Sequence, residues 1–432
     1  MKHSLSHLTR RLGVTASVSL ALSGLWGCAT PETSLEEQRA VGINTIRDPS
    51  FKSDKACGPY PSYYIEYLDD TKCRKRLPSD RNRDFQCPLK SSPDLVENTP
   101  GYAPLTARDG QVTVDESALA GIVPSDVAVT MIVIRRVGGV PYYRYLSNGR
   151  HNDVLEMWSS SKFLGIINAS ESIRYSSDGE IGLDSSIEGI PLGDLVTVVH
   201  NYEESNYTSN GLMYWFYDVG GRGFANQMVH SRWLNRPDAE EYGGNYGAKP
   251  PELGFTFTRG EQEVEVKPFE DWRPSNKLST FTLAEALKRL VMHREDPAGR
   301  LEYSTWDDIK VLLYGATESL WYDDKTPQGM ESDTAVYVQE AVNIGEVDQQ
   351  TQGQWRIFSK LGLGFSRGGE FVHTDYACLP VFNDKGEPEL DAGAEVVISV
   401  HLPANKDYVQ GDRRLAGIYR DLIQGVLQGT IR

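Results

Sequence analysis

The chain has 432 residues, of which 39% are hydrophobic and 24% are charged, an ordinary globular composition that allows one large domain with an extension, or two domains. Its formal net charge of −16 repels phosphate backbones, so we expect no nucleic-acid partner. Beyond the N-terminal region no apolar run reaches about 18 residues, and the sequence therefore indicates no internal membrane-spanning helix.

The N-terminal residues have the pattern of an export signal. Basic side chains within residues 2–11 precede a mildly apolar run over residues 14–26, which is too short to span a bilayer. The run ends in Leu-Trp-Gly-Cys at residues 25–28, which resembles the lipobox of bacterial lipoproteins. In that interpretation the small Gly27 suits the signal peptidase, and the thiol of Cys28 receives the lipid that anchors the protein to a membrane.

The alternative interpretation is a plain secretory signal followed by a chance cysteine. As a lipoprotein, the chain would lose residues 1–27 as a signal peptide, and the polar residues 28–50 would form a lipid-anchored tether. Ala29 follows the cysteine where an aspartate would, by analogy, retain the protein at the inner membrane. We therefore expect a membrane-anchored bacterial lipoprotein that faces the periplasm, with attachment to the outer membrane favoured.

Four further cysteines form an even set in a chain that we expect to be exported: Cys57, Cys73, Cys87 and Cys378. An oxidising compartment favours two disulfides, for which three connectivities are possible. The set has no Cys-x-x-Cys pair and no nearby histidine of a zinc site, and we expect no metal and no cofactor. Residues 51–111 indicate a cysteine-containing extension with little core of its own. Since Cys378 alone lies in the main domain, residues 112–432, one bridge should tie the extension to it.

The main domain is expected to combine strands at both of its ends with helices between them. The predicted elements, in chain order, are a hairpin of strands at 127–135 and 140–146, helices at 158–167, 191–202, 208–219 and 282–290, strands at 355–358, 371–381 and 395–402, and an amphipathic helix at 412–427. This order predicts an α+β fold. An antiparallel sheet is built from the N- and C-terminal strands, is flanked by helices, and is joined to a helical subdomain.

Residues 159–162, Ser-Ser-Ser-Lys, are the only Ser-x-x-Lys sequence in the chain. Positions i and i+3 share one face of a helix, so the amine of Lys162 can reach the hydroxyl of Ser159. A lysine whose ammonium form is disfavoured can take the proton of a serine, and a helix N-terminus offers N–H groups to an oxyanion. The alternative interpretation is a serine-capped helix that carries a surface lysine.

The order of the motifs carries a resemblance to a known family. The predicted hairpin precedes Ser-x-x-Lys, a helix then leads into residues 204–210 (ESNYTSN), and a Gly-Gly turn follows at 220–221. The two asparagines of residues 204–210 are four positions apart. Lys360-Leu361-Gly362, the only Lys-x-Gly in the chain, comes after a predicted strand and ahead of two more. Over about residues 115–432 the chain resembles the β-lactamase/penicillin-binding-protein superfamily of serine hydrolases, and class A β-lactamases in particular.

The resemblance implies a role for each matching residue. Ser159 would attack a carbonyl carbon, and Lys162 would act as its general base. Asn206 would hydrogen-bond the substrate amide. Lys360 would lie across the site, near a substrate carboxylate, and tune the charges of the other groups.

The strand segment that follows Lys360 is expected to bind substrate. Gly362 would allow close approach of the ligand, and the N–H groups of Leu363 and Ser159 would form the oxyanion hole. Leu361 replaces the threonine or serine whose hydroxyl binds a substrate carboxylate in the family.

Two further departures concern catalysis. Glu204 stands where the family has a serine or tyrosine that passes a proton to the leaving nitrogen, and a slip of one residue would place Ser205 there instead. Residues 232–235 resemble a loop that carries a deacylating glutamate in class A enzymes, but that glutamate is absent. Glu240 and Glu241 lie nearby as possible substitutes.

Two functions from different classes follow. The first is a serine hydrolase that forms an acyl-enzyme on peptide, amide or ester substrates related to cell-wall peptides or β-lactams. The second is a catalytically silent protein of the same fold that binds wall fragments or a partner protein. The retained motif residues favour the enzyme, whereas the three departures favour the binder.

Overall fold

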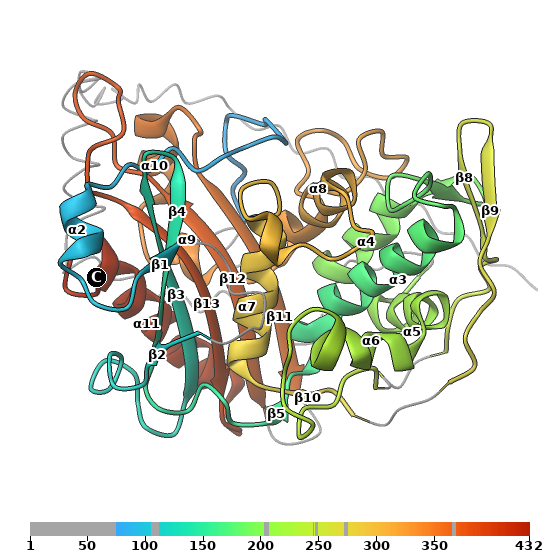
Figure 1. The fold of residues 1–432 in the computed structure, drawn as a ribbon, viewed down its shortest axis with the longest axis horizontal. Helices are drawn as coiled ribbons and strands as arrows, with labels where there is room; N and C mark the ends of the chain where they lie inside the picture. The colour runs from blue at the N-terminus through green and yellow to red at the C-terminus, as the bar shows by residue number, and fades with distance from the viewer. Residues whose placement is uncertain are drawn as a thin grey trace, which may run out of the picture.

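The structure is a computed structural model, and it describes residues 75–104, 112–202, 207–244, 246, 249–271, 275–364 and 369–432 (Figure 1). Several predictions fall outside these described residues. They are the signal peptide, the tether and the candidate positions Cys28, Cys57, Cys73, Glu204, Ser205 and Asn206.

The centre of the molecule is a seven-stranded sheet assembled from both ends of the described chain. Its strand order is β1-β4-β3-β13-β12-β11, and β2 pairs in parallel with β4 while the other neighbours are antiparallel. The strands are β1 (Ala103–Pro104), β2 (Val114–Asp115), β3 (Ala128–Val137), β4 (Val140–Ser147), β11 (Arg356–Gly364), β12 (Glu370–Leu379) and β13 (Ala394–Leu402). Strand β11 forms one edge of this sheet.

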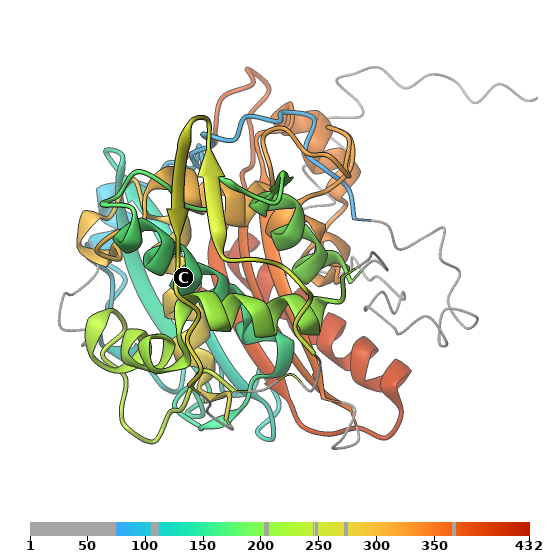
Figure 2. The ribbon, with the colours of Figure 1, turned by 90° about the vertical axis from the view of Figure 1, so that its right-hand side faces the viewer.

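Helices cover both faces of the sheet and build a second lobe beside it. The α-helices are α2 (Pro93–Glu97), α3 (Lys162–Ser176), α4 (Leu192–Asn201), α5 (Ser209–Gly220), α6 (Arg222–Gln227), α7 (Thr280–Val291), α8 (Trp306–Tyr314), α9 (Tyr337–Glu340), α10 (Ile344–Thr351) and α11 (Tyr408–Leu427). Short helical turns are η2 (Trp158–Ser161), η3 (Met228–Arg232), η4 (Pro297–Gly299) and η5 (Gly329–Ser332). Figure 2, which looks onto the helical lobe, shows its helices and the β8–β9 hairpin in front of the sheet.

Two minor sheets complete the described structure. One joins β5 (Leu155–Glu156) to β10 (Lys277–Leu278), and the other has the order β7-β6-β8-β9. The strands of the latter are β6 (Ser186–Ile187), β7 (Ile190–Pro191), β8 (Thr256–Arg259) and β9 (Gln262–Glu265).

The large sheet separates two apolar cores because alternate side chains of each strand point to opposite faces. Figure 1 shows α7 over one face and α11 behind the other. On β11, Phe358 belongs to the core beneath α7 and the helical lobe, whereas Ile357 and Leu361 belong to the core beneath α9 and α11. Lys360 therefore points toward the helical lobe, and its neighbour Leu361 points away from it.

The α+β arrangement expected from the sequence is confirmed. Both ends of the domain supply strands, and the predicted hairpin, the helices between the strands and the terminal helix are all present. Two elements are longer than expected, since α3 continues to Ser176 and β11 continues to Gly364. The sequence analysis did not identify α8 or the β8–β9 hairpin. Among the described residues no helix is both long and apolar enough to cross a membrane.

The described part of the N-terminal extension is attached to the main domain at several points. Helix α2 contributes no buried residue, whereas Cys87 and Leu89 of the extension are buried in the core beneath α7 and the helical lobe. A disulfide joins Cys87 to Cys378 on β12, so the expected bridge between extension and domain is confirmed. Strand β1 pairs with β4, which means that the extension also supplies the outermost strand of the large sheet.

Candidate active site

Ser159 lies in η2, the helical turn that leads directly into α3. The preceding residue, Trp158, has a φ of 48°, a left-handed conformation that costs about 1–3 kcal/mol for a residue other than glycine and persists only where the surroundings impose it. The indole of Trp158 lies against Gly364 at the end of β11 and donates to Glu370 Oε2 over 2.8 Å. These contacts hold the turn in a conformation that leaves Ser159 half-buried.

The serine turn packs closely against the edge strand β11, through a side-chain hydrogen bond and through close approach of the two backbones. The hydroxyl of Ser160 donates to the carbonyl oxygen of Lys360 over 3.0 Å. A Cβ atom at Gly362 would lie 2.6 Å from the nitrogen of Ser160 and 2.9 Å from that of Ser159. Gly362 is therefore required for β11 to approach the serine turn, rather than for approach of a ligand as we expected.

Lys162 begins α3 and its side chain is fully buried. Its Nζ donates to Ser209 Oγ over 2.9 Å and to Asn210 Oδ1 over 2.7 Å, at the start of α5. Burial holds the pKa of Lys162 well below its usual range, and the positive charge of Lys360 lowers it further. A neutral amine has two N–H groups and one lone pair, so these two bonds use both donors and leave the lone pair available.

Lys360 is bonded differently from Lys162. Its Nζ donates to Tyr202 Oη over 2.5 Å, to Asp333 Oδ2 over 3.2 Å and to the carbonyl oxygen of Leu361 over 3.1 Å. Three acceptors match the three N–H groups of an ammonium ion. Burial lowers the pKa of Lys360, while Asp333 opposes that shift. Burial alone would raise the pKa of Asp333, but Lys360 holds it below its usual range.

Tyr202 connects Ser159 to Lys360. It ends α4 in a left-handed conformation, with a φ of 56°, which turns its side chain into the site. Its hydroxyl donates to the carbonyl oxygen of Leu361 over 2.7 Å. Burial raises the pKa of Tyr202 well above its usual range, and the neighbouring Ser159 side chain only partly opposes this shift. Tyr202 is therefore a neutral phenol.

The structure thus brings together three of the five predicted catalytic residues, Ser159, Lys162 and Lys360. The other two, Glu204 and Asn206, lie outside the described residues. Asn210, the second asparagine of the motif, accepts a hydrogen bond from Lys162. Direct hydrogen bonding between Ser159 and Lys162 was expected, but the side chain of Lys162 bonds to Ser209 and Asn210 of α5 instead.

Sequence analysis did not identify Tyr202, although a signal for it existed. The resemblance allowed a serine or a tyrosine as the proton-transfer group, and Tyr202 is the residue that immediately follows the helix before the motif. Asp333 had no comparable signal, since it lies in the turn between η5 and α9, far from every motif.

Two expectations for residues 360–363 need correction. Lys-Leu-Gly lies on β11 itself and not after the strand. The side chain of Leu361 is 1% exposed and belongs to the core beneath α11, so it does not line the site, and only its backbone does. Leu361 N–H donates to Asp333 and its carbonyl accepts from Tyr202, so both groups point away from β12. Backbone groups of alternate residues in an edge strand point the same way, so the N–H of Leu363 also points away from β12.

The candidate substitutes for the missing loop glutamate are not at this site. Glu240 is fully buried and is bonded to Arg236, Ser279 and Thr282 near the start of α7. Its neighbour Glu241 pairs through its backbone with Lys277. The aromatic ring of Tyr246 lies next to Lys162, with its centroid 4.9 Å from Lys162 Nζ. The hydroxyl of Tyr246 lies 3.0 Å from Ser161 Oγ.

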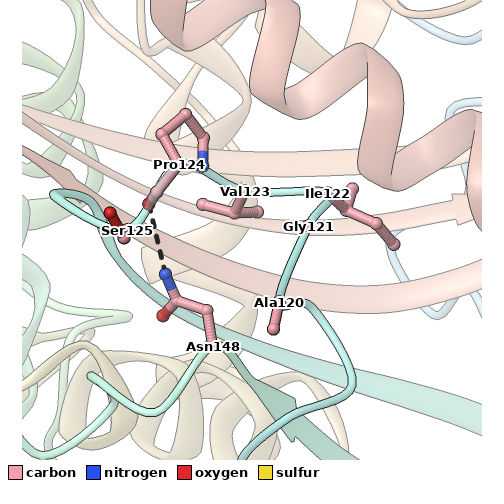
Figure 3. Close-up of a pocket in the computed structure, with 7 residues that line it drawn as sticks. All are labelled: Ala120, Gly121, Ile122, Val123, Pro124, Ser125 and Asn148. Carbon is pink, nitrogen blue, oxygen red and sulfur yellow. Dashed lines mark hydrogen bonds between the residues drawn. The ribbon is translucent and has the colours of Figure 1, made fainter.

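Other parts of the described chain offer less chemistry. No group of three or more histidine, cysteine or acidic side chains within it is arranged to hold a metal ion. A surface hollow lies beside the loop over residues 120–125 (Figure 3). The amide of Asn148 at its side donates to the carbonyl of Pro124 over 3.3 Å. Its lining residues, 120–125 and Asn148, include no titratable side chain.

Comparisons with known proteins give matches only in structure. No family model and no curated protein sequence matches the chain. A class A β-lactamase from Mycobacterium abscessus is 16% identical, aligns over 72% of this chain and 96% of its own, and has a TM-score of 0.40. A β-lactamase from Burkholderia vietnamiensis is 15% identical over 72% and 95%, with a TM-score of 0.39. The enzyme L2, solved with relebactam, is 15% identical over 73% and 99%, with a TM-score of 0.38.

The geometry of the described chain agrees with the resemblance stated from the motifs. Strands from both ends form one sheet, the Ser-x-x-Lys turn opens a buried helix, and Lys-x-Gly lies on the edge strand beside that turn. The observed arrangement is the α+β fold that the resemblance implies.

Proposed function

We propose that the protein is a serine hydrolase that forms an acyl-enzyme on Ser159. One observation carries the proposal. Among the described residues, Lys162 has two hydrogen-bond acceptors around its amine and Lys360 has three, which matches a neutral amine at Lys162 and an ammonium ion at Lys360. A neutral amine next to a serine is a general base, and an ammonium next to a tyrosine stabilises the phenolate that forms when the tyrosine gives up its proton.

In the proposed acylation the lone pair of Lys162 accepts the proton of Ser159 as Oγ attacks the substrate carbonyl carbon. The carbonyl oxygen becomes an oxyanion and is bound by the N–H groups of Ser159 and Leu363. When the tetrahedral intermediate collapses, the bond to the leaving nitrogen or oxygen breaks. Tyr202 donates its proton to that leaving atom and is reprotonated from the Lys162 ammonium, so the proton taken from Ser159 leaves with the product.

The proposed substrates are small molecules or peptides with an amide, ester or β-lactam carbonyl, in keeping with the resemblance to cell-wall enzymes. Leu361 offers no side chain to the site, so no hydroxyl at that position binds a substrate carboxylate. We therefore favour substrates that do not depend on that contact.

A catalytically silent binder remains the second candidate, and one observation favours it. Hydrolysis of an acyl-enzyme needs a second base to activate water, and Glu240 is held in the α7 contacts instead. We therefore propose that acylation is faster than deacylation. A protein with no acylation at all would be the silent binder.

The test is incubation of the soluble body with a fluorescent penicillin, followed by mass spectrometry of the labelled peptide. We expect a long-lived adduct on Ser159 that is absent from Ser159→Ala and forms about 10²–10⁴-fold more slowly in Lys162→Ala. Ser125→Ala, at an exposed serine of the surface hollow, is the matched control and should label normally. Absence of an adduct on the unmodified protein would reject the enzyme, and rapid steady-state turnover of penicillin would reject slow deacylation.

A further inference from the structure

A row of buried charged side chains, here called the buried charge row, leads from Lys360 to the N-terminal segment. Its first member, Asp333, accepts hydrogen bonds at Oδ2 from Lys360 Nζ over 3.2 Å and from the N–H of Leu361 over 3.0 Å. The other carboxylate oxygen of Asp333 lies 3.9 Å from Nε2 of His373. The side chains of Asp333, Lys360 and His373 are all 0% exposed, so each charge depends on its neighbours rather than on water.

The buried charge row continues along β12. Nδ1 of His373 lies 2.5 Å from Oδ2 of Asp375, and Oδ1 of Asp375 accepts from Ser359 Oγ over 2.5 Å. Strand pairing places Ser359 directly opposite Asp375. The rings of Tyr337 and Tyr419 pack against His373 with centroid distances of 4.7 and 5.3 Å. Packing and pairing together leave these polar groups little freedom to rearrange.

Lys75 is the last member of the buried charge row, and this lysine belongs to the N-terminal extension. Its Nζ donates to Ser359 Oγ over 3.2 Å and to the carbonyl oxygen of Met330 over 3.5 Å. Burial lowers the pKa of Lys75, while the carboxylates of Asp333 and Asp375 raise it. The ammonium of Lys75 is therefore within electrostatic reach of both aspartates.

The segment around Lys75 is held by specific contacts. The backbone N–H of Arg76 donates to Gln339 Oε1 and its carbonyl accepts from Gln339 Nε2, both over 2.9 Å. Further along, Arg81 forms an ion pair with the buried Glu331 over 3.0 Å. Lys75 thus enters the domain as part of an ordered chain and not as a loosely placed side chain.

Charge balance gives a reason for a second cation at this position, in addition to His373, which lies 2.5 Å from Asp375. Glu331, Asp333 and Asp375 are all almost fully buried, and a buried carboxylate is strongly destabilising unless a cation or hydrogen-bond donors compensate it. Lys360 compensates Asp333, and Arg81 compensates Glu331. Lys75 is the lysine that lies beside the Ser359–Asp375 pair.

We propose that Lys75 is a positioning residue for acylation, whose ammonium fixes Asp375 and His373 and, through Asp333, holds the Lys360 ammonium on Tyr202. The inference rests on the proposed function, in which Tyr202 and Lys360 deliver a proton to the leaving group. It makes the N-terminal segment part of the working site, although Lys75 touches no substrate.

The test compares Lys75→Met with Arg76→Met, a matched loss of charge at the neighbouring exposed side chain. In Lys75→Met the maximal rate of penicillin acylation should fall roughly 10- to 100-fold, the scale for a small displacement of a catalytic group. The penicillin concentration that gives half the maximal rate should not change. Arg76→Met should acylate normally, and Lys75→Arg should restore most of the rate. An unchanged maximal rate in Lys75→Met would overturn the proposal.

A double-mutant cycle covers the case in which Lys75→Met does not fold. Because Lys75 acts through Asp375, adding Lys75→Met to Asp375→Asn removes both buried charges and should change the acylation rate little relative to Asp375→Asn alone. A further large loss in the double variant would show that Lys75 acts by another route, and would overturn the proposal.

A readout without acylation separates the two proposals. In protein labelled with ¹³Cε-lysine, the Lys360 signal is identified by its loss in Lys360→Met. That signal should shift in Lys75→Met and stay in place in Arg76→Met. If the unmodified protein forms no penicillin adduct, the proposed function fails, but a shifted Lys360 signal still supports positioning by Lys75. An unshifted signal would reject that positioning whatever the labelling result.

Discussion

The two lysines and the tyrosine of the site differ in the hydrogen bonds that each of them makes. Lys162 has both N–H groups of a neutral amine engaged, and Lys360 has all three of an ammonium engaged. The hydroxyl of Tyr202 donates a hydrogen bond to the carbonyl oxygen of Leu361 and accepts one from Lys360. The proposed roles of general base and proton donor depend on this bonding pattern and not on the residue types alone.

The first prediction concerns Tyr202. In Tyr202→Phe the aromatic ring is kept but the hydroxyl that would protonate the leaving atom is lost, so acylation by a penicillin should slow by about 10²–10⁴-fold. Stopped-flow or gel-based labelling of Ser159 measures this rate. Tyr175→Phe, at a 67% exposed tyrosine in α3, should acylate normally. Equal rates for Tyr202→Phe and the unmodified protein would exclude Tyr202 from proton transfer.

The second prediction concerns pH. The base form of Lys162 is the reactive one, so the acylation rate should rise with pH as Lys162 loses its proton and should level off below its ordinary pKa of 10.5. The charge of Lys360 contributes to the lowered pKa. Lys360→Met should therefore raise the pKa of Lys162 and move the rise to higher pH. Rate–pH profiles check this, with the exposed Lys277→Met as the control that should not move.

At the scale of elements, β11 serves two parts of the molecule at once. Its even-numbered side chains, such as Lys360, point toward the helical lobe, and odd-numbered ones, such as Leu361, point into the core beneath α11. The backbone of Leu361 faces the site while its side chain does not. Substitution at this position therefore tests core packing rather than substrate binding.

The third prediction follows from that orientation. Leu361→Thr restores the residue type of the family at this position, but it should lower the free energy of unfolding by about 2–4 kcal/mol, since it removes buried apolar volume and buries a hydroxyl. It should not speed acylation, contrary to what the motif alone would suggest. Chemical denaturation measures the loss, and Leu390→Thr, at a 58% exposed leucine, should have little effect. Faster acylation by Leu361→Thr would show that the side chain reaches the site.

At the scale of the whole molecule, the N-terminal segment and the domain are joined by covalent, ionic and strand contacts. The Cys87–Cys378 bridge spans 291 residues of sequence, and strand β1 pairs with β4. Lys75 is the last member of the buried charge row. The segment is therefore part of the folded unit, even though its own helix contributes nothing to the core.

The fourth prediction concerns this bridge. Replacing both Cys87 and Cys378 with serine should lower the free energy of unfolding by about 2–5 kcal/mol, because a cross-link across a long loop restricts the unfolded chain. Each single substitution removes the same bond, so the single and double variants should lose similar amounts. Losses that add up across the two sites would contradict a shared bridge.

The fifth prediction concerns the N-terminus. We propose that residues 1–27 are removed and that Cys28 carries a lipid, which would anchor the periplasm-facing body to the outer membrane. Mass spectrometry of the mature N-terminal peptide would check this. Cell fractionation should also find that the Cys28→Ala protein no longer associates with membranes. An unmodified Cys28, or a mature end at another residue, would favour the plain secretory signal.

The sequence by itself determined much of the architecture. A β-branched run predicted the first strand of the hairpin, serine residues predicted the start of the helix that contains α3, and amphipathic periodicity predicted α11. The order of the motifs predicted the fold. It also identified Ser159, Lys162 and Lys360, because Ser-x-x-Lys and Lys-x-Gly are each present once. Counting cysteines on either side of residue 112 was enough to predict that Cys378 bonds to the extension. These are local patterns or properties of the chain that do not depend on three-dimensional contacts.

The tertiary structure alone decided what surrounds those residues. The left-handed end of α4 turns Tyr202 into the site, Asp333 arrives from a turn with no motif, and Lys75 arrives from the extension. The pKa of a lysine depends on burial and on neighbouring charges from distant parts of the chain, which no local pattern records. Which face of β11 carries Leu361 depends on the register with β12, because a shift of one residue would exchange the two faces.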